Sequence, residues 1–271
     1  ETSIDNVTYD TIGACRQPDQ LTVETFTDSS ASLAWRSNGT GNTWVVEYDT
    51  AGFTPGQGTV KGGVNDTFTT LNSLDPDTKY KAYIREVCVN GDTSAYGLSV
   101  AFRTACDTPA PVTLPYTQDF EGLSGTYQDY QQFCGLGQAN WKFRSTDTTG
   151  RLRFNGNGIA SASGTKAATL DKSQGSGSAA NDFILTLNMI SYTTTEPYVL
   201  FFDHRDYQDA GDPNDSVWVR GSQADPWIGL YDLDSAAKGT YQTIGPLNVS
   251  RALTQNNQAY SSSFQIRFGQ E

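Results

Sequence analysis

The sequence predicts an all-β protein that is built from sandwich domains in series. Short runs of Thr, Val, Tyr, Phe and Trp are separated by clusters of Gly, Asn, Asp, Pro and Ser. Residues 32–35 and 80–85 alternate polar with apolar side chains, which is typical of strands that bury one face. Helical periodicity is almost absent, and the one helix that we expect is a turn or two near residues 248–253.

The first half of the chain contains six predicted strands, which alternate with turn residues. They lie at residues 20–25, 31–36, 44–48, 66–71, 79–88 and 99–104. Residues 107–115 then include Pro109, Pro111 and Pro115, a proline density that indicates an extended, semi-rigid linker. We place the domain boundary in this linker.

The second half of the chain continues the same pattern. Predicted strands lie at residues 116–120, 141–144, 152–155, 167–171, 183–187, 198–203, 216–220, 228–231, 241–246 and 263–268. Two sandwich domains of this kind account for a chain of 271 residues.

Composition and missing motifs exclude several functional classes. The formal net charge is −12, and such a surface repels nucleic acid. No apolar run approaches the roughly 20 residues of a membrane-spanning helix, so we expect no membrane insertion in this segment. The chain has one histidine and no G-x-S-x-G, H-E-x-x-H or P-loop motif, so we expect no enzyme.

Residues 15–106 resemble a fibronectin type III domain. Trp35 lies in the second predicted strand, where that family has its core tryptophan, and residues 74–80 resemble its L-x-P-x-T-x-Y motif. The resemblance implies a seven-stranded sandwich in which the hydroxyl of Tyr80 bonds to the backbone at a corner. Residues 90–93 read Asn-Gly-Asp-Thr, so the Arg-Gly-Asp integrin motif of some members is not implied.

Residues 116–271 resemble a MAM-like jelly-roll domain. The resemblance depends on Asp119-Phe120-Glu121, Trp141, residues 215–221 and the closing residues 264–268, although the usual cysteines of that family are missing. The two modules alternate in surface adhesins of Bacteroidetes and in animal receptors. The resemblance therefore implies an extracellular or cell-surface adhesion segment, with surface glycans or other cells as partners. The alternatives are an accessory carbohydrate-binding region of a secreted hydrolase and an animal receptor ectodomain fragment.

Four cysteines, at positions 15, 88, 106 and 134, allow three disulfide pairings. In the fibronectin-like arrangement, the end of the sixth strand lies at the same pole as the start of the domain. The resemblance therefore implies a Cys15–Cys88 bond, which leaves Cys106 to pair with Cys134. Disulfides of this kind favour an extracellular location.

Two groups of carboxylates are candidate ligands for a structural calcium ion, which takes six to eight oxygen ligands. The first group is the acidic loop with Asp206, Asp209, Asp212 and Asp215, for which the alternative is a solvated loop. The second group is Asp119 and Glu121, which point to the same face if they lie on a strand. Its alternative is an exposed polar face. Asp5, in the strand-like N-terminal segment, is a further candidate.

Aromatic and hydroxyl side chains offer other possible sites. Trp227 and Tyr207 are candidates for stacking on a sugar, although a packed core aromatic is the more common role. Asp-Ser/Thr-apolar triplets, which Bacteroidetes glycosylate, would place sugars on Thr11, Thr50, Ser216 and Ser235.

The N-terminal segment predicts a tandem repeat. Residues 3–9 have the composition of a strand and resemble the I-D-[DN]-V strand that closes MAM-type domains, whereas the jelly roll of this chain lacks such a strand after Phe268. We therefore expect residues 1–10 to be the final strand of a preceding jelly-roll unit. In a repeat array, Ile4 and Val7 should lie beside the strand that ends at Phe268. The alternative is that these residues pack on the first sandwich.

Overall fold

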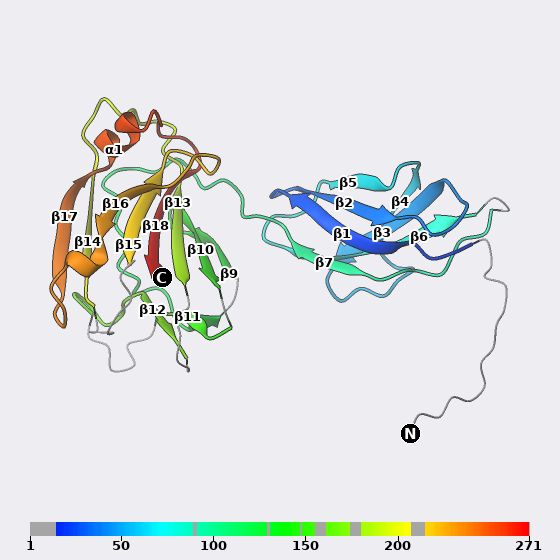
Figure 1. Cartoon of the computed structure of the whole chain (residues 1–271), viewed down its shortest axis with the longest axis horizontal. Coiled ribbons are helices and arrows are strands. Elements are labelled where there is room, and N and C mark those ends of the chain that lie inside the picture. Colours follow the sequence, from blue (N-terminus) through cyan, green and yellow to red (C-terminus); the bar gives the residue numbers. More distant parts are fainter. Residues whose placement is uncertain are drawn as a thin grey trace, which may run out of the picture. The chain divides into compact units, whose positions relative to one another are not determined.

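The computed structural model describes residues 15–88, 91–128, 131–146, 148–154, 161–173, 180–206 and 215–270. The chain divides into two compact units, Glu1–Asp107 and Thr108–Glu271. Almost every element in both units is a strand, so the predicted all-β class is confirmed (Figure 1).

The first unit is a sandwich of two antiparallel sheets, one in the order β1-β2-β5 and the other in the order β4-β3-β6-β7. Its strands are β1 (Asp19–Phe26), β2 (Ser30–Arg36), β3 (Thr43–Thr50), β4 (Thr59–Val64), β5 (Phe68–Asn72), β6 (Lys79–Val87) and β7 (Val100–Arg103). Every second side chain of β2 and β6 is buried, as their alternating sequence predicted. The prediction missed β4, whose Gly-Gly sequence and exposed side chains lack this alternation.

The core of this sandwich includes Trp35 and Trp44, whose rings meet edge to face at 6.0 Å. Tyr80 is also buried, and its hydroxyl accepts a hydrogen bond from the backbone N–H of Asp75 at 2.9 Å. This contact confirms the predicted tyrosine corner, which closes the turn that leads into β6.

A disulfide joins Cys15 to Cys88, with 5.6 Å between the two Cα atoms. The predicted pairing is therefore confirmed. Cys106 and Cys134 are also disulfide-bonded, and no described cysteine is free. The remaining predicted pair, Cys106 with Cys134, agrees with these bonding states.

Glu47 is a fully buried carboxylate in β3 of the first unit. It accepts hydrogen bonds from the backbone N–H groups of Gly56 and Gly58, both at 2.7 Å, and from the hydroxyl of Tyr96. Burial acts to raise the pKa of Glu47, but these hydrogen bonds outweigh it and hold the pKa below its usual value. The charged form is therefore favoured in the folded state.

Replacing Glu47 with glutamine should destabilise the first unit by about 1–2 kcal/mol at pH 7, because a charged acceptor is lost from a buried site. Because the folded-state pKa is depressed, the wild-type advantage is present above about pH 4.3 and is lost as the pH falls through the folded pKa. Urea denaturation of both proteins, at pH 7 and at acidic pH, would measure the difference between their free energies of unfolding. An equal difference between the two proteins at both pH values would contradict this prediction.

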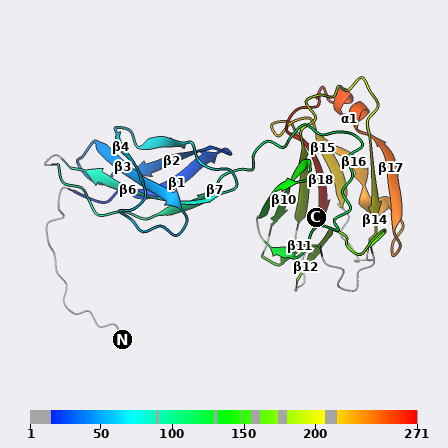
Figure 2. The ribbon, with the colours of Figure 1, turned by 180° about the vertical axis from the view of Figure 1, so that it is seen from behind.

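The second unit has one six-stranded sheet in the order β16-β15-β18-β13-β10-β9, together with the smaller sheets β12-β11-β8 and β14-β17 (Figures 1 and 2). Its strands are β8 (Thr126–Gln128), β9 (Gln131–Leu136), β10 (Ala139–Ser145), β11 (Gly150–Arg153), β12 (Thr169–Lys172), β13 (Asn181–Leu187), β14 (Val199–His204), β15 (Ser216–Arg220), β16 (Ile228–Asp232), β17 (Gln242–Asn248) and β18 (Phe264–Gln270). The one α-helix is α1 (Val249–Gln255), where the sequence predicted it, and Asn248 caps its first turn by accepting from the N–H of Arg251.

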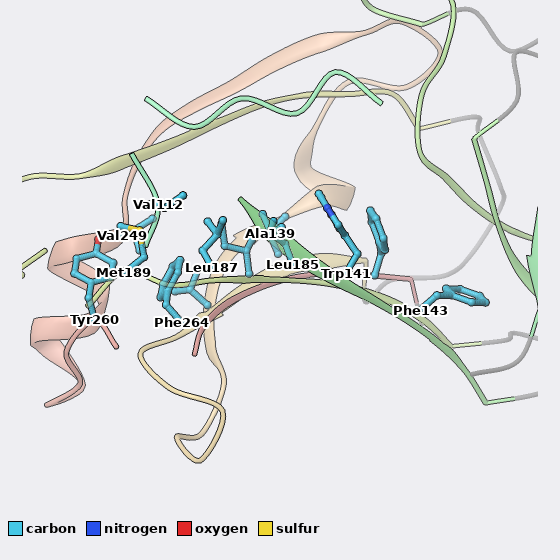
Figure 3. Close-up of a cluster of buried hydrophobic side chains, with 14 of the residues drawn as sticks. Val112, Ala139, Trp141, Phe143, Leu185, Leu187, Met189, Val249, Tyr260 and Phe264 are labelled. Carbon is cyan, nitrogen blue, oxygen red and sulfur yellow. The ribbon is translucent and has the colours of Figure 1, made fainter. Parts of the chain in front are cut away.

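The core of the second unit lies on one face of the six-stranded sheet. Trp141 and Phe143 of β10 and Leu185 and Leu187 of β13 point into it, and Met189 joins them at one end (Figure 3). Trp141 stacks on Phe183 with 4.1 Å between their ring centroids. The two smaller sheets contribute to the same core through Leu152 of β11 and Phe202 of β14.

The strand predicted at residues 116–120 is wrong: these residues form no strand, and Phe120 has a φ of +63°. Strands β8 and β9 were not predicted, because their Gln-rich sequences do not alternate clearly.

Residues 1–10 lie outside the described residues. Their predicted position beside the strand ending at Phe268 is also wrong, since β13 and β15 already pair with the two edges of β18.

Candidate ligand-binding face

The second face of the six-stranded sheet carries polar and aromatic side chains. In β15, Val217 and Val219 are buried in the core, so Trp218 and Arg220 lie on the opposite face. The sequence left the orientation of Trp218 open, and the structure decides it. We use the term cation–aromatic face for the following set: Lys142, Arg144, Trp218, Arg220, Trp227 and Arg267.

Two guanidinium groups lie over the two indole rings of this face. The guanidinium carbon of Arg267 is 4.1 Å from the ring centroid of Trp218 and 5.9 Å from that of Trp227. The guanidinium carbon of Arg220 is 4.2 Å from the centroid of Trp227. These distances are typical of cation–π contacts, which hold the guanidinium groups in defined positions.

Hydrogen bonds hold the same two arginines to the sheet. Arg220 donates from Nε and Nη2 to Oε1 of Gln265, at 2.8 and 2.5 Å, and from Nη1 to the carbonyl oxygen of Asp225 at 3.3 Å. Gln265 in turn donates to Thr186 Oγ1 at 2.9 Å. Arg267 forms an ion pair with Asp182. These contacts hold both guanidinium groups in defined positions on the sheet.

Positive charges are close enough on this face to affect each other. Burial lowers the pKa of Lys142, and the nearby charges of Arg144 and Arg220 lower it further. Burial also lowers the pKa of Arg220; Asp225 opposes this effect, while Arg144 and Arg267 add to it. Burial is the largest cause of both shifts.

The sequence identified only part of this face. Trp227, a predicted sugar-stacking residue, is half-buried and has Arg220 over its ring, while Tyr207 lies outside the described residues. The prediction missed Lys142, Arg220 and Arg267 as possible ligand-binding residues. The Trp-Lys-Phe, Val-Trp-Val-Arg and Ile-Arg-Phe alternations place these side chains away from the core, but sequence alone does not bring them together.

The structure describes only part of the predicted acidic calcium loop. Asp206 forms an ion pair with Lys238 at 3.0 Å, and the backbone N–H of Asp215 donates to Asp234. Asp5, Asp209 and Asp212 lie outside the described residues. Among the described residues, the only group of three potential metal ligands contains two disulfide-bonded cysteines. The calcium site therefore stays a prediction.

Neither Asp119 nor Glu121 lies in a strand, so the expectation that they share one face of a strand is wrong. The Glu121 carboxylate accepts from the N–H and hydroxyl of Thr165, at 2.8 and 2.7 Å, and from the N–H of Lys166 at 2.8 Å. These bonds lower the pKa of Glu121. Asp119 accepts from the N–H of Glu121 at 3.1 Å. Both carboxylates thus have local structural roles, whether or not a cation binds nearby.

The predicted glycosylation sites differ in accessibility. Thr50 and Ser235 are exposed, and Ser216 is half-buried on β15. Ser235 ends the short 3-10 helix η1 (Leu233–Ser235), where its hydroxyl donates to the carbonyl of Asp232 at 2.5 Å. Thr11 lies outside the described residues. Modification of the four residues stays a prediction.

Comparison with known proteins assigns the first unit. Residues 16–103 match the family model of the fibronectin type III domain, so this prediction is confirmed. Among the similar solved structures are the FN1–FN3 domains of chicken CNTN1, with 16% identity, 34% of this chain and 31% of that chain covered, and a TM-score of 0.31. The FN5 domain of Drosophila Lar has 18% identity and a TM-score of 0.28, and the match covers 34% of this chain and 97% of that chain. The fibronectin type III domain of human fibronectin type III domain containing protein 3 has 20% identity and a TM-score of 0.29, and the match covers 37% of this chain and 95% of that chain.

No curated protein matches the chain. The described part of the chain has no helix with the length and apolar character needed to cross a membrane. Fibronectin type III domains are generally non-catalytic modules and are typical of extracellular proteins, and the disulfides agree with that location.

Proposed function

We propose that the chain is a non-enzymatic segment of an extracellular adhesion or surface-fibre protein, and that it represents one period of a tandem array of β-sandwich modules. The fibronectin type III match and the Cys15–Cys88 disulfide support an extracellular module. The second sandwich, a jelly roll of MAM-like character in this proposal, alternates with it as in surface adhesins of Bacteroidetes. Neighbouring repeats are then partners of the chain.

The observation that carries the array proposal is a segment of the second unit, residues 116–119, that follows the hydrogen-bonded residues 111–114 but has no backbone partner itself. Burial alternates along residues 112–120 like that of a strand: Val112 is buried, Leu114, Tyr116, Gln118 and Phe120 are partly buried, and the residues between them are exposed. Yet, among the described residues, no backbone hydrogen bond joins residues 116–119 to another segment.

A strand supplied by the next repeat would satisfy this segment. Unpaired backbone groups beside an apolar core cost free energy and are usually paired with another strand. Addition of a strand to such an edge is a common mode of association, because the backbone provides the hydrogen bonds and alternate side chains enter the core. Residues 3–9 of a following copy have a suitable composition, and residues 116–119 replace β18 as their proposed neighbour.

A head-to-tail fusion of two copies of the chain tests this proposal. We expect slower amide hydrogen exchange at residues 116–119 of the first copy than of the second, because only the first copy has a following repeat. Mass spectrometry of copy-specific peptides, with one copy isotope-labelled, measures the difference.

A matched fusion provides the control. It carries Ile4→Asn and Val7→Asn in the second copy, so that apolar side chains are lost from the donated strand while the linker length is unchanged. Exchange at residues 116–119 of the first copy should then return to the rate of the second copy. Equal rates in both copies of the unsubstituted fusion would contradict the array proposal.

A further inference from the structure

The small sheet β14-β17 exposes apolar side chains on its outer side. Its two strands lie side by side at the margin of the second unit, and α1 follows the end of β17 (Figures 1 and 2). Leu200 and Phe202 of β14 pack on the core, so Val199, Phe201 and Asp203 lie on the outer side. Val199 is 43% exposed and Phe201 is 55% exposed. We use the term Phe201 face for the outer residues of this sheet: Val199, Phe201, Asp203, Thr243, Gly245 and Asn248.

The ring of Phe201 lies against the backbone of β17 at a glycine. A Cβ atom at Gly245 would lie 2.8 Å from Cδ1 of Phe201, so a side chain at this position would collide with the ring. Among the described residues, the ring contacts no cation and no other aromatic ring. The indole rings of the cation–aromatic face differ in this respect, because arginines cover them. Phe201 therefore offers an open aromatic surface that the sheet supports from below.

Hydrogen-bonding groups flank this ring at both ends of the Phe201 face. Thr243 Oγ1 donates to Oδ1 of Asp203 at 2.6 Å, and in the described part of the chain Oδ2 of Asp203 accepts no hydrogen bond. At the other end, Asn248 lies opposite Val199 and accepts from the N–H of Arg251 through Oδ1. Its Nδ2 donates to none of the described residues. The face thus has an apolar centre, an acceptor at one end and a donor at the other.

A polar pocket of about 230 Å³ continues the face at its Asn248 end. The pocket lies between residues 194–197 and the side chains of α1, and Asn248 lines both the pocket and the face. Glu196, Arg251 and Gln255 contribute a carboxylate, a guanidinium and an amide. All three side chains are exposed, and none has a hydrogen bond or an ion pair within the described ranges. The pocket therefore offers donors and acceptors whose charges balance.

We propose that the Phe201 face and this pocket bind a linear, neutral polysaccharide whose pyranose rings carry equatorial hydroxyl groups. The C–H bonds of such a sugar form a flat apolar surface that stacks on the ring of Phe201. Its hydroxyl groups point outward in the plane of the sugar, where Asp203 accepts and Asn248 donates hydrogen bonds. Val199 and Asp203 are about 13 Å apart along the strand, so the face and the pocket together suit several sugar units.

Charge and contact area favour a neutral sugar over other ligands. The face and the pocket together contain the carboxylates of Asp203 and Glu196 and the guanidinium of Arg251, so an anionic ligand meets no positive surplus. A protein partner needs roughly 800 Å² of contact on each side. The exposed large apolar side chains of this face are only Val199 and Phe201. A sugar polymer, in contrast, needs one stacking ring with polar groups at its edges.

Sugar recognition rests on the proposed adhesion function and names the class of its ligand. All residues of the Phe201 face and the pocket belong to the second unit of one chain, so binding needs no following repeat. A chain that binds no sugar therefore leaves the exchange result of the two-copy fusion unaffected. A fusion without protection at residues 116–119 likewise leaves sugar binding measurable.

Isothermal titration of the whole chain with cellohexaose tests the proposal. We expect saturable binding that changes little as salt is added, because a neutral ligand forms no ion pair. Hydrogen exchange with the sugar present should slow in peptides that contain residues 199–204 and 242–248. Absence of saturable binding would overturn the proposal, as would tighter binding to an oligogalacturonate of the same length, which is anionic.

Two phenylalanine substitutions give a matched pair of variants. Phe201→Ala removes the stacking surface and should weaken binding about tenfold. Phe68→Ala removes a ring that is 63% exposed on β5 of the first unit, and it should leave the affinity unchanged. Near-ultraviolet circular dichroism checks that both variants stay folded. Equal affinities of the two variants would locate binding elsewhere and overturn the proposal.

Sedimentation of the chain without sugar tests whether a second copy covers the same face. We expect the wild-type chain, Phe201→Ala and Phe68→Ala to sediment alike over a range of concentrations. A concentration-dependent dimer that Phe201→Ala alone abolishes would assign the Phe201 face to self-association and overturn the proposal.

Discussion

Replacing Phe154 with alanine should destabilise the second unit by about 3–5 kcal/mol, the range for truncation of a buried aromatic side chain. Phe154 is 1% exposed, and its ring lies between Phe120 and Phe183, each with 5.8 Å between centroids. The rings of Tyr127 and Phe133 also contact it, at 6.0 and 6.3 Å. The substitution leaves a cavity where several segments meet, because the surrounding rings cannot fully collapse.

Chemical denaturation, monitored by hydrogen exchange in peptides from β10 and β13, measures this loss of stability specifically in the second unit. Phe201→Ala is the matched control. Phe201 lies in β14 of the same unit and is 55% exposed, so its truncation should change the free energy of unfolding by less than about 0.5 kcal/mol. Similar losses in the two variants would contradict the assignment of Phe154 to the centre of the core.

Removing the Cys15–Cys88 disulfide should destabilise the first unit by about 4 kcal/mol. The two cysteines are separated by 73 residues in sequence, and closing a loop of that length restricts the unfolded chain strongly. The bond also links the start of the domain to the residue after β6, so its loss frees the segment before β1. The double variant Cys15→Ala/Cys88→Ala avoids leaving a reactive thiol.

Guanidinium denaturation of this variant, monitored through the buried Trp35 and Trp44 environment, measures the change in the first unit. The second unit serves as an internal control, since neither cysteine belongs to it. Its exchange rates should be unchanged. A first unit that retains wild-type stability without the bond would show that packing alone determines its stability.

Local patterns predicted most of the first unit because its strands bury one face only. The alternation in β2 and β6 specifies which side chains enter the core, and the corner motif specifies the position of Tyr80. The family resemblance also led to the Cys15–Cys88 pairing. Strand β4 escaped prediction because its Gly-Gly sequence has no alternation to detect, and pairing with β3 defines it instead.

The segment at residues 116–120 illustrates a limit of such patterns. Its sequence alternates and its burial does too, but a strand also requires a partner for its backbone groups. Among the described residues, that partner is missing. Local sequence specifies which side chains face inward, whereas hydrogen bonding depends on a second segment that local sequence does not identify.

Local sequence alone specifies the all-β class, the alternating faces of the strands, the fibronectin type III module and the helix at α1. These features follow from local periodicity, capping and motif spacing. Tertiary structure, in contrast, is needed to bring Lys142, Trp218, Arg220 and Arg267 to one face. They lie on β10, β15 and β18, strands far apart in sequence, and the pairing of β13 with both β10 and β18 sets their register. The candidate site therefore depends on strand order, because neighbours across a sheet need not be neighbours along the chain.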